Sequence, residues 1–189
     1  MTGQDQQEAE PWPYPPQLLL PELDRYLSDA VPADQSLPIC CPPWTVRDMT
    51  VHLLCTFSRF HRMLAQGRAG DFSAPFPMDQ LAAENDRAVR GYQGADPARE
   101  LRAAVAGFAA ALGDGAELIP HQRGPIPVAQ QVVYGINELA LHHGDVAVAA
   151  GHEYVPPPET LGVLQFMWRR QWHDVTTWAG MLRASGRNT

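Results

Sequence analysis

The stretch TVRDMTVHLLCTFSRFHRMLAQ, residues 45–66, decides the fold because it predicts a long helix with a defined start and one apolar face. Thr45 and Asp48 have the spacing of a capping box, in which a hydroxyl and a carboxylate satisfy the first backbone N–H groups of a helix. Apolar residues then recur at helical spacing, at Leu53, Phe57, Phe60 and Leu64. Gly67 and Gly70 follow, and glycine commonly ends a helix. We therefore expect a helix that packs this face against other helices.

Helical patterns continue on both sides of this stretch. We expect further helices over residues 16–30, 78–91, 97–112, 127–150 and 159–182. Trp168 and Trp172 have helical spacing in the last of these and are predicted to lie in the core. The loops are short and no useful strand-like alternation occurs, which indicates an all-α bundle. Residues 1–15 are polar and proline-rich and predict a flexible tail, followed by a single domain over residues 16–189.

The composition excludes several classes of function. The net charge is -7 and no basic stripe gathers the arginines, so neither nucleic acid nor an anionic membrane is an expected partner. All 14 basic residues are arginine, which rules out a Schiff-base lysine and a phosphate-binding loop of the GxxxxGK(S/T) type. The first residues lack the pattern of a signal peptide, and no apolar run approaches the roughly 20 residues that span a bilayer. We therefore expect a cytoplasmic protein with reduced cysteines.

The segment NELALHHGD, residues 137–145, carries the chemistry. Glu138 and His142 are four residues apart and Asp145 follows three later, so on a helix these side chains fall within about 60° of one another. They border the apolar stripe rather than the solvated face. Two carboxylates beside apolar surface repel each other and lose hydration, and a divalent cation relieves both penalties. The spacing alone also fits a surface ion pair between Glu138 and His142.

His52 has the same place at the border of the apolar stripe in the 45–66 helix. Two histidines and a glutamate from two facing helices form a three-ligand set, which leaves one coordination position open, as a catalytic metal requires. By itself, a lone histidine at such a border is more typical of a hydrogen-bonded residue. His61 and His143 project away from these faces, and we expect both at the surface.

Three further residues are weaker candidates. His121 and Arg123 lie in the loop before the 127–150 helix, where they can reach the mouth of an active site. Arg59 lies two turns along from His52 and can bind an anionic group of a substrate. A solvent-facing arginine fits the position of Arg59 equally well.

The two motifs resemble those of a known family. Residues 42–53, PPWTVRDMTVHL, are similar to the opening of mycothiol-dependent maleylpyruvate isomerases, and residues 138–147, ELALHHGDVA, are similar to a later helix of these proteins. Asn85 matches the family's asparagine in the intervening helix. The similarity covers residues 16–151, and two motifs in the right order are more specific than either alone. These isomerases belong to the DinB/YfiT-like metalloenzymes, which are four-helix bundles with a three-ligand metal centre.

The resemblance implies a DinB-like four-helix bundle, to which this chain adds a C-terminal helix over residues 159–182. It implies that His52, Glu138 and His142 bind a divalent metal, with zinc expected, and that Asp145 lies beside these ligands. It also implies a small thiol cosubstrate, which is mycothiol in actinobacteria or bacillithiol in firmicutes, and the lysine-free composition favours the actinobacterial thiol. Coordination to a metal deprotonates a thiol at neutral pH.

The family's isomerases carry a second, smaller domain, whereas this sequence ends at Thr189 after one further expected helix. We therefore expect a metal-dependent thiol transferase that acts on an electrophilic small molecule, in detoxification or in the tailoring of secondary metabolites. A thiol-dependent isomerase, a metal hydrolase or lyase, and a non-catalytic binding module stay open as alternatives, because a fold does not fix a function. The oligomeric state is open as well, a homodimer included.

Overall fold

The computed structural model describes residues 10–40, 43–172 and 174–187. Its helices are α1 (Leu19–Ala30), α2 (Val46–Arg68), α3 (Leu81–Gly91), α4 (Pro97–Ala111), α5 (Val128–Ala149), α6 (Pro158–Gln171) and α7 (Trp178–Ala184). Short 3₁₀ helices, η1 (Pro16–Leu18) and η2 (Met78–Gln80), precede α1 and α3. Two-residue strands, β1 (Leu118–Ile119) and β2 (Ile126–Pro127), pair antiparallel before α5. The expectation of an all-α fold is confirmed.

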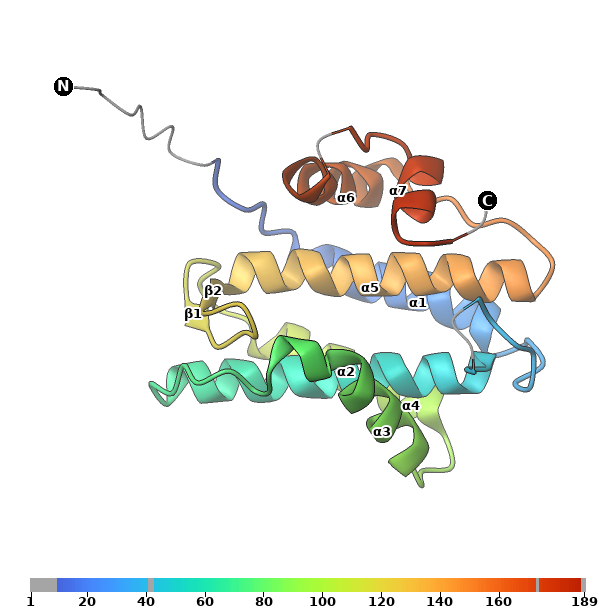
Figure 1. Ribbon diagram of the computed structural model, residues 1–189, viewed down its shortest axis with the longest axis horizontal. Helices are drawn as coiled ribbons and strands as arrows, with labels where there is room; N and C mark the ends of the chain where they lie inside the picture. Colours follow the sequence, from blue (N-terminus) through green and yellow to red (C-terminus); the bar gives the residue numbers. More distant parts are fainter. Residues whose placement is uncertain (1–9, 41–42, 173, 188–189) are drawn as a thin grey trace.

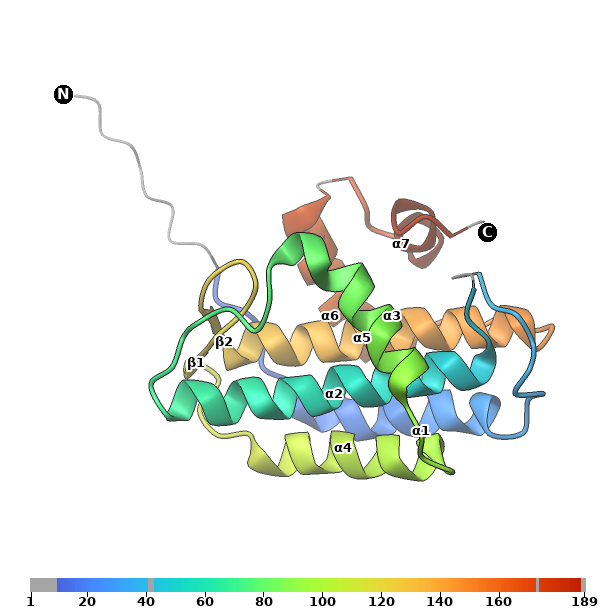
Figure 2. The same ribbon diagram turned by 60° about the horizontal axis from the view of Figure 1, so that its bottom comes forward.

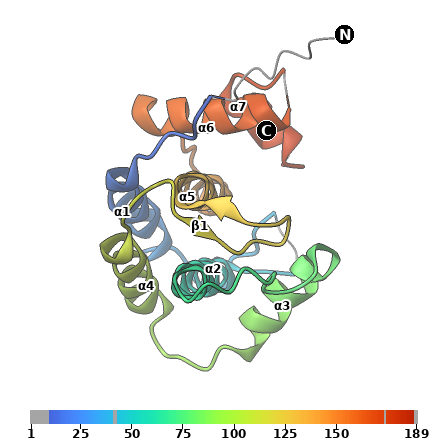
Figure 3. The same cartoon turned by 90° about the vertical axis from the view of Figure 1, so that its left-hand side faces the viewer.

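Four long helices form the bundle. Seen end-on, α1, α2, α4 and α5 occupy its four corners, with α2 and α5 side by side (Figure 3). Helix α3 packs on the outside of α2 (Figure 2), and α6 and α7 cover the outer side of α5 (Figure 1). Helices α2 and α5 therefore pack against each other, and α3 crosses the outside of α2 (Figure 2). No helix in the described ranges combines the length and the apolar character needed to cross a bilayer.

The start of α2 is the capping box that the sequence predicts. The Thr45 side chain accepts a hydrogen bond from the backbone N–H of Asp48 at 3.3 Å, and Asp48 Oδ2 accepts from the backbone N–H of Thr45 at 3.0 Å. The predicted apolar stripe of α2 is buried, at Leu53, Phe57, Phe60 and Leu64. Phe108 from α4 meets Phe57 with a distance of 6.1 Å between ring centroids. These contacts fix the rotation of α2 and so determine which side chains it presents to α5.

The C-terminal segment differs from the prediction. A single helix over residues 159–182 is wrong, because the structure breaks it into α6 and α7. Trp172 leaves the helical conformation with φ -144° and ψ 87°, and a run of β-branched residues at 175–177, which disfavour helix, follows it. The Thr177 hydroxyl then accepts from the backbone N–H of Gly180 and starts α7 as an N-cap. Trp172 is consequently 44% exposed rather than in the core, whereas Trp168 is buried as predicted.

The N-terminal segment is described from residue 10 onward. Residues 1–9 of the predicted tail lie outside the described residues. The ring of Trp12 packs edge-on against Tyr134 and Phe166, at centroid distances of 5.9 and 5.5 Å. The Tyr14 hydroxyl donates to the carbonyl of Gly113 at 2.8 Å. The predicted division into a tail and a single domain stays a prediction.

Gly67, in the last turn of α2, allows the strand β1 to approach closely. A Cβ at this position would lie 2.6 Å from the carbonyl oxygen of Leu118 and 3.1 Å from the Cα of Ile119. Because both atoms belong to backbone, we expect Gly67→Ala to lower the free energy of unfolding by about 1–3 kcal/mol. Gly162→Ala is the control, since nothing lies within 4 Å of its Cβ position in α6. It should stabilise by about 0.4–1 kcal/mol. Urea unfolding of both variants tests the packing, and equal shifts would contradict it.

Candidate metal centre

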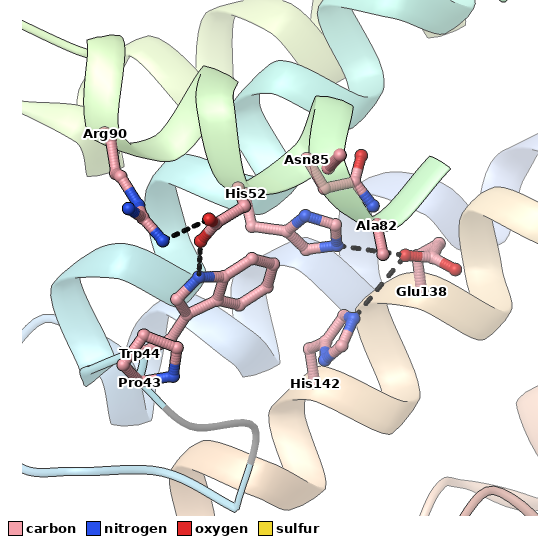
Figure 4. Close-up of a pocket in the computed structure, with 10 residues that line it drawn as sticks. Pro43, Trp44, His52, Ala82, Asn85, Arg90, Glu138 and His142 are labelled. Carbon is pink, nitrogen blue, oxygen red and sulfur yellow. Dashed lines mark hydrogen bonds and ion pairs between the residues drawn. The ribbon is translucent and has the colours of Figure 1, made fainter. Parts of the chain in front are cut away.

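Three side chains from α2 and α5 converge between the two helices. His52 comes from the second turn of α2, and Glu138 and His142 come from successive turns of α5 (Figure 4). Their candidate ligand atoms all lie within 4.8 Å of one another. His52 Nε2 lies 3.4 Å from Glu138 Oε2, and His142 Nε2 lies 3.5 Å from the same oxygen. The structure thus brings the three predicted ligands together across the bundle.

The donor set fits a divalent metal ion. Zinc binds histidine nitrogen and carboxylate oxygen at about 2.0–2.2 Å in tetrahedral geometry, so neighbouring ligand atoms should lie about 3.3–3.5 Å apart. The two measured distances to Glu138 Oε2 match this separation. Three protein ligands also leave the fourth position of a tetrahedron to water or substrate, which is the pattern of catalytic zinc sites. His52, Glu138 and His142 would hold the ion.

The orientation of His142 gives a second indication that a cation belongs here. Asp145 Oδ2 lies 2.8 Å from His142 Nδ1, and a carboxylate can only accept, so Nδ1 carries the proton. In a neutral imidazole, Nε2 then directs its lone pair at Glu138 Oε2, which is another acceptor. Two acceptors 3.5 Å apart need a proton or a metal ion between them. A metal ion bound here would take the place of that proton, with His142 and Glu138 as ligands.

Asp145 is itself held from the C-terminal end of the chain. Arg187 donates from Nε to Asp145 Oδ1 at 2.6 Å and from Nη2 to Oδ2 at 2.7 Å. The Cys40 thiol also donates to Oδ1 at 2.8 Å. The Asp145 side chain is 1% exposed, so these partners replace its hydration. Arg187 follows α7 and is not among the predicted site residues, because no spacing pattern relates it to Asp145.

His52 is packed rather than hydrogen-bonded on its far side. The ring of Trp44 lies against the imidazole, with 4.9 Å between centroids, and the Trp44 indole donates to Asp86 at 3.3 Å (Figure 4). His52 is buried, and within the described ranges its Nδ1 has no hydrogen-bond partner. The rings of Trp44 and His142 flank the imidazole, and its Nε2 is directed at Glu138.

Burial and the neighbouring charges shift the pKa values of all three side chains. Burial alone would raise the pKa of Glu138, but hydrogen bonds from His142 and His52 hold it well below its usual range. Burial lowers the pKa of His52, which keeps its imidazole neutral and able to bind a cation. For His142, the carboxylates of Asp145 and Glu138 outweigh burial and raise the pKa to about 9. The site therefore favours positive charge between His142 and Glu138.

Two cavities meet at His52 and Glu138. The larger has a volume of about 640 Å³ and lies between α3 and the α2–α5 pair, where Trp44, Asn85 and Arg90 line it with the three candidate ligands (Figure 4). The smaller has a volume of about 140 Å³ and shares His52 and Glu138 with the first. A group bound at the centre is thus accessible from two directions.

Of the remaining predicted site residues, Arg59 and His121 line a cavity at the centre, whereas Arg123 does not. Arg59 lines the smaller cavity, as does His121 from the β1–β2 connection. Arg123 is exposed and is not among the residues that line either cavity; only its backbone N–H contacts the site region, by donating to His121 Nδ1 at 3.2 Å. His61 is at the surface, as predicted.

The prediction of a surface position for His143 is wrong. Its side chain is buried, because α1 and the segment after α5 cover this side of α5. Asp29 of α1 lies 2.7 Å from His143 Nε2 and 2.8 Å from His152 Nε2. The ring of Tyr154 stacks on His143 with 3.7 Å between centroids. His143 therefore joins α1 to the C-terminal segment and lies on a different side of α5 from the candidate ligands.

Comparison with known protein families gives a match. The family model of the mycothiol maleylpyruvate isomerase N-terminal domain matches residues 18–147. The matched region contains all three candidate ligands and Asp145, and it ends before α6, so Arg187 lies outside it. Neither the comparison with curated proteins nor the comparison with solved structures found a match.

Proposed function

Because this chain belongs to the mycothiol maleylpyruvate isomerase N-terminal domain family, a DinB-like family, we propose that it is a metal-dependent enzyme that transfers a small thiol to an electrophile. The expected metal is zinc, and the expected thiol is mycothiol or a close analogue. The observation that carries the proposal is the convergence of His52 Nε2, Glu138 Oε2 and His142 Nε2 within 4.8 Å. This set offers a divalent ion three ligands and leaves one position for a substrate.

The residues around the centre have separate roles in this proposal. A metal ion at the centre supplies the charge that deprotonates a bound thiol at neutral pH. Asp145 holds His142 in the tautomer that presents Nε2. Trp44 covers the outer face of His52 and excludes water from that side of the ligand. The larger cavity, about 640 Å³, has the size of a small-molecule site and is the place we assign to the thiol.

A thiol-binding test addresses the proposal directly. We expect cobalt(II)-substituted protein to change its visible absorption spectrum when mycothiol is added, because a sulfur ligand joins the coordination sphere. S-methyl mycothiol is the matched control, since it retains the shape of the thiol but cannot form a thiolate, and it should leave the spectrum nearly unchanged. An unchanged spectrum with mycothiol at saturating concentration would count against a thiol at this centre.

Product mass separates the proposed transfer from the other reactions that such a centre supports. Transfer adds the mass of the thiol to the electrophile, whereas isomerisation leaves the mass unchanged and hydrolysis adds the mass of water. We expect thiol adducts, formed only when thiol and metal are both present. Turnover without any thiol would instead favour a hydrolase, in which the open position holds an activated water.

A further inference from the structure

The smaller cavity beside the candidate metal centre contains the cation of Arg59, whose hydrogen-bond acceptors among the described residues are neutral. Arg59 projects from α2 two turns after His52, on the same face of the helix. Its Nη1 and Nη2 each donate to Asn85 Oδ1 at 3.1 Å, and Nη2 donates to the Thr56 hydroxyl at 3.3 Å. Both acceptors are neutral. Among the described residues, no carboxylate lies within ion-pair distance of Arg59.

Charge compensation for this guanidinium comes from Glu138, which lines the same cavity, and from Glu84, and both carboxylates lie beyond ion-pair distance. A partly buried guanidinium loses part of its hydration, and neutral acceptors offset only part of that loss. Two of its five N–H groups, on Nε and on Nη1, have no acceptor among the described residues. The Phe76 ring lies 5.2 Å from the Arg59 carbon Cζ and covers one side of the guanidinium. The guanidinium is thus held in place and can donate further hydrogen bonds.

A second polar side chain in the same cavity also has an unmet hydrogen bond. Gln131 lies on α5 two turns before Glu138 and therefore on the same face. It is 1% exposed, and within the described ranges its Oε1 has no partner. Buried amides in folded proteins are nearly always satisfied. Arg59 and Gln131 come from different helices, so two independent elements leave polar groups unsatisfied in one small space.

The position and size of the cavity indicate which part of a ligand it accepts. It shares His52 and Glu138 with the larger cavity, so a group within it is adjacent to the metal centre. Its volume of about 140 Å³ is below the roughly 300 Å³ of a typical ligand pocket, and it suits a group of a few heavy atoms. A guanidinium fork matches the paired oxygens of a carboxylate or of a phosphate, and the planar carboxylate is the smaller of the two groups.

We propose that Arg59, with Asn85 and Gln131 beside it, forms a subsite for the carboxylate of a small electrophilic acid, while the thiol occupies the larger cavity. This inference rests on the proposed function, since it names the class of the second substrate. Asn85 orients the guanidinium from α3, and Gln131 binds a polar substituent near the carboxylate. The acid would be held with its reactive carbon towards the metal centre.

Binding of crotonate, without any thiol present, tests the subsite. Crotonamide has the same shape without the charge, so we expect wild-type protein to bind crotonate in preference to crotonamide in ligand-detected NMR titrations. Arg59→Gln should weaken crotonate binding by about tenfold or more, because a charged hydrogen-bond pair is lost. Arg62→Gln is the matched control, since Arg62 is exposed on the same helix and lines neither cavity at the centre; it should leave binding unchanged. Arg59→Lys should retain part of the affinity.

Metal analysis of the same samples keeps the two proposals separate. Arg59→Gln should keep the wild-type zinc content and melting temperature, which shows that the variant is folded. Titrations on zinc-free protein should give weaker but still Arg59-dependent binding. If crotonate binding requires zinc and is unchanged in Arg59→Gln, the carboxylate binds the metal and the subsite is wrong. Equal affinity for crotonate and crotonamide would also overturn the subsite. Arg59-dependent binding by a wild-type protein that cannot be loaded with zinc would uphold the subsite and reject the metal-dependent function.

Discussion

His52→Ala should purify with almost no bound metal, whereas the wild type should retain about one ion per chain. His52 supplies one of only three candidate protein ligands, and the other two both come from α5. Removal of the imidazole leaves only Glu138 and His142 as ligands, and water can then reach the ion from the side of α2. Removal of a hydrogen bond that only supports a ligand lowers metal affinity by about 10- to 100-fold. The loss of metal affinity in His52→Ala should be larger than this. Metal analysis after gel filtration, followed by a chelator competition, measures the difference.

Two controls distinguish a lost ligand from a damaged fold. His61→Ala changes an exposed histidine on the same helix and should keep the full metal content. Glu138→Gln alters another candidate ligand with almost no change in volume, so it should lose metal without a packing defect. A metal-free His52→Ala that retains its helical circular dichroism supports the assignment. Full occupancy in both His52→Ala and Glu138→Gln would refute it.

The sequence predicts the helices and the convergence of the three candidate ligands because the signals for both are local. The capping box at Thr45 fixes where α2 begins, and its apolar stripe fixes the rotation that turns His52 inward. Glu138 and His142 need only the helical period to share a face. The alignment of α2 against α5 depends on contacts between distant residues, so no local pattern predicts it. We predicted it from the order of the two motifs along the chain, which is shared with a known family.

What the sequence does not reveal depends on contacts between distant segments. Arg187 reaches Asp145 across 42 positions, through two helices and a break that no periodicity describes. His143 looks like a surface residue on a helical projection, yet α1 and the segment after α5 enclose it. Trp172 fits a continuous helix until a β-branched run ends it. In each case, packing between elements overrides what the local pattern indicates.

Asp145→Ala should weaken metal binding by about 10- to 100-fold and also destabilise the fold, although Asp145 is not a candidate ligand itself. His142 would lose the acceptor that keeps the proton on Nδ1, and loss of such a partner has an effect of this size in other metal sites. Arg187 Nη2, 3.4 Å from His142 Nδ1, would remain as an unpaired cation beside a site that should hold another cation. Removing one member of a buried ion pair costs about 3–5 kcal/mol of unfolding free energy.

The double variant Asp145→Ala, Arg187→Ala separates these two effects. Stability should recover in part, because no lone charge is left near α5, but metal affinity should stay low, because His142 still lacks its acceptor. Asp24→Ala removes the carboxylate of an exposed ion pair with Arg102, and it should change stability by no more than about 1 kcal/mol. Urea unfolding and chelator competition on the four proteins give both quantities. If Asp145→Ala binds metal as tightly as the wild type, then the Asp145 carboxylate does not set the direction in which the His142 lone pair points.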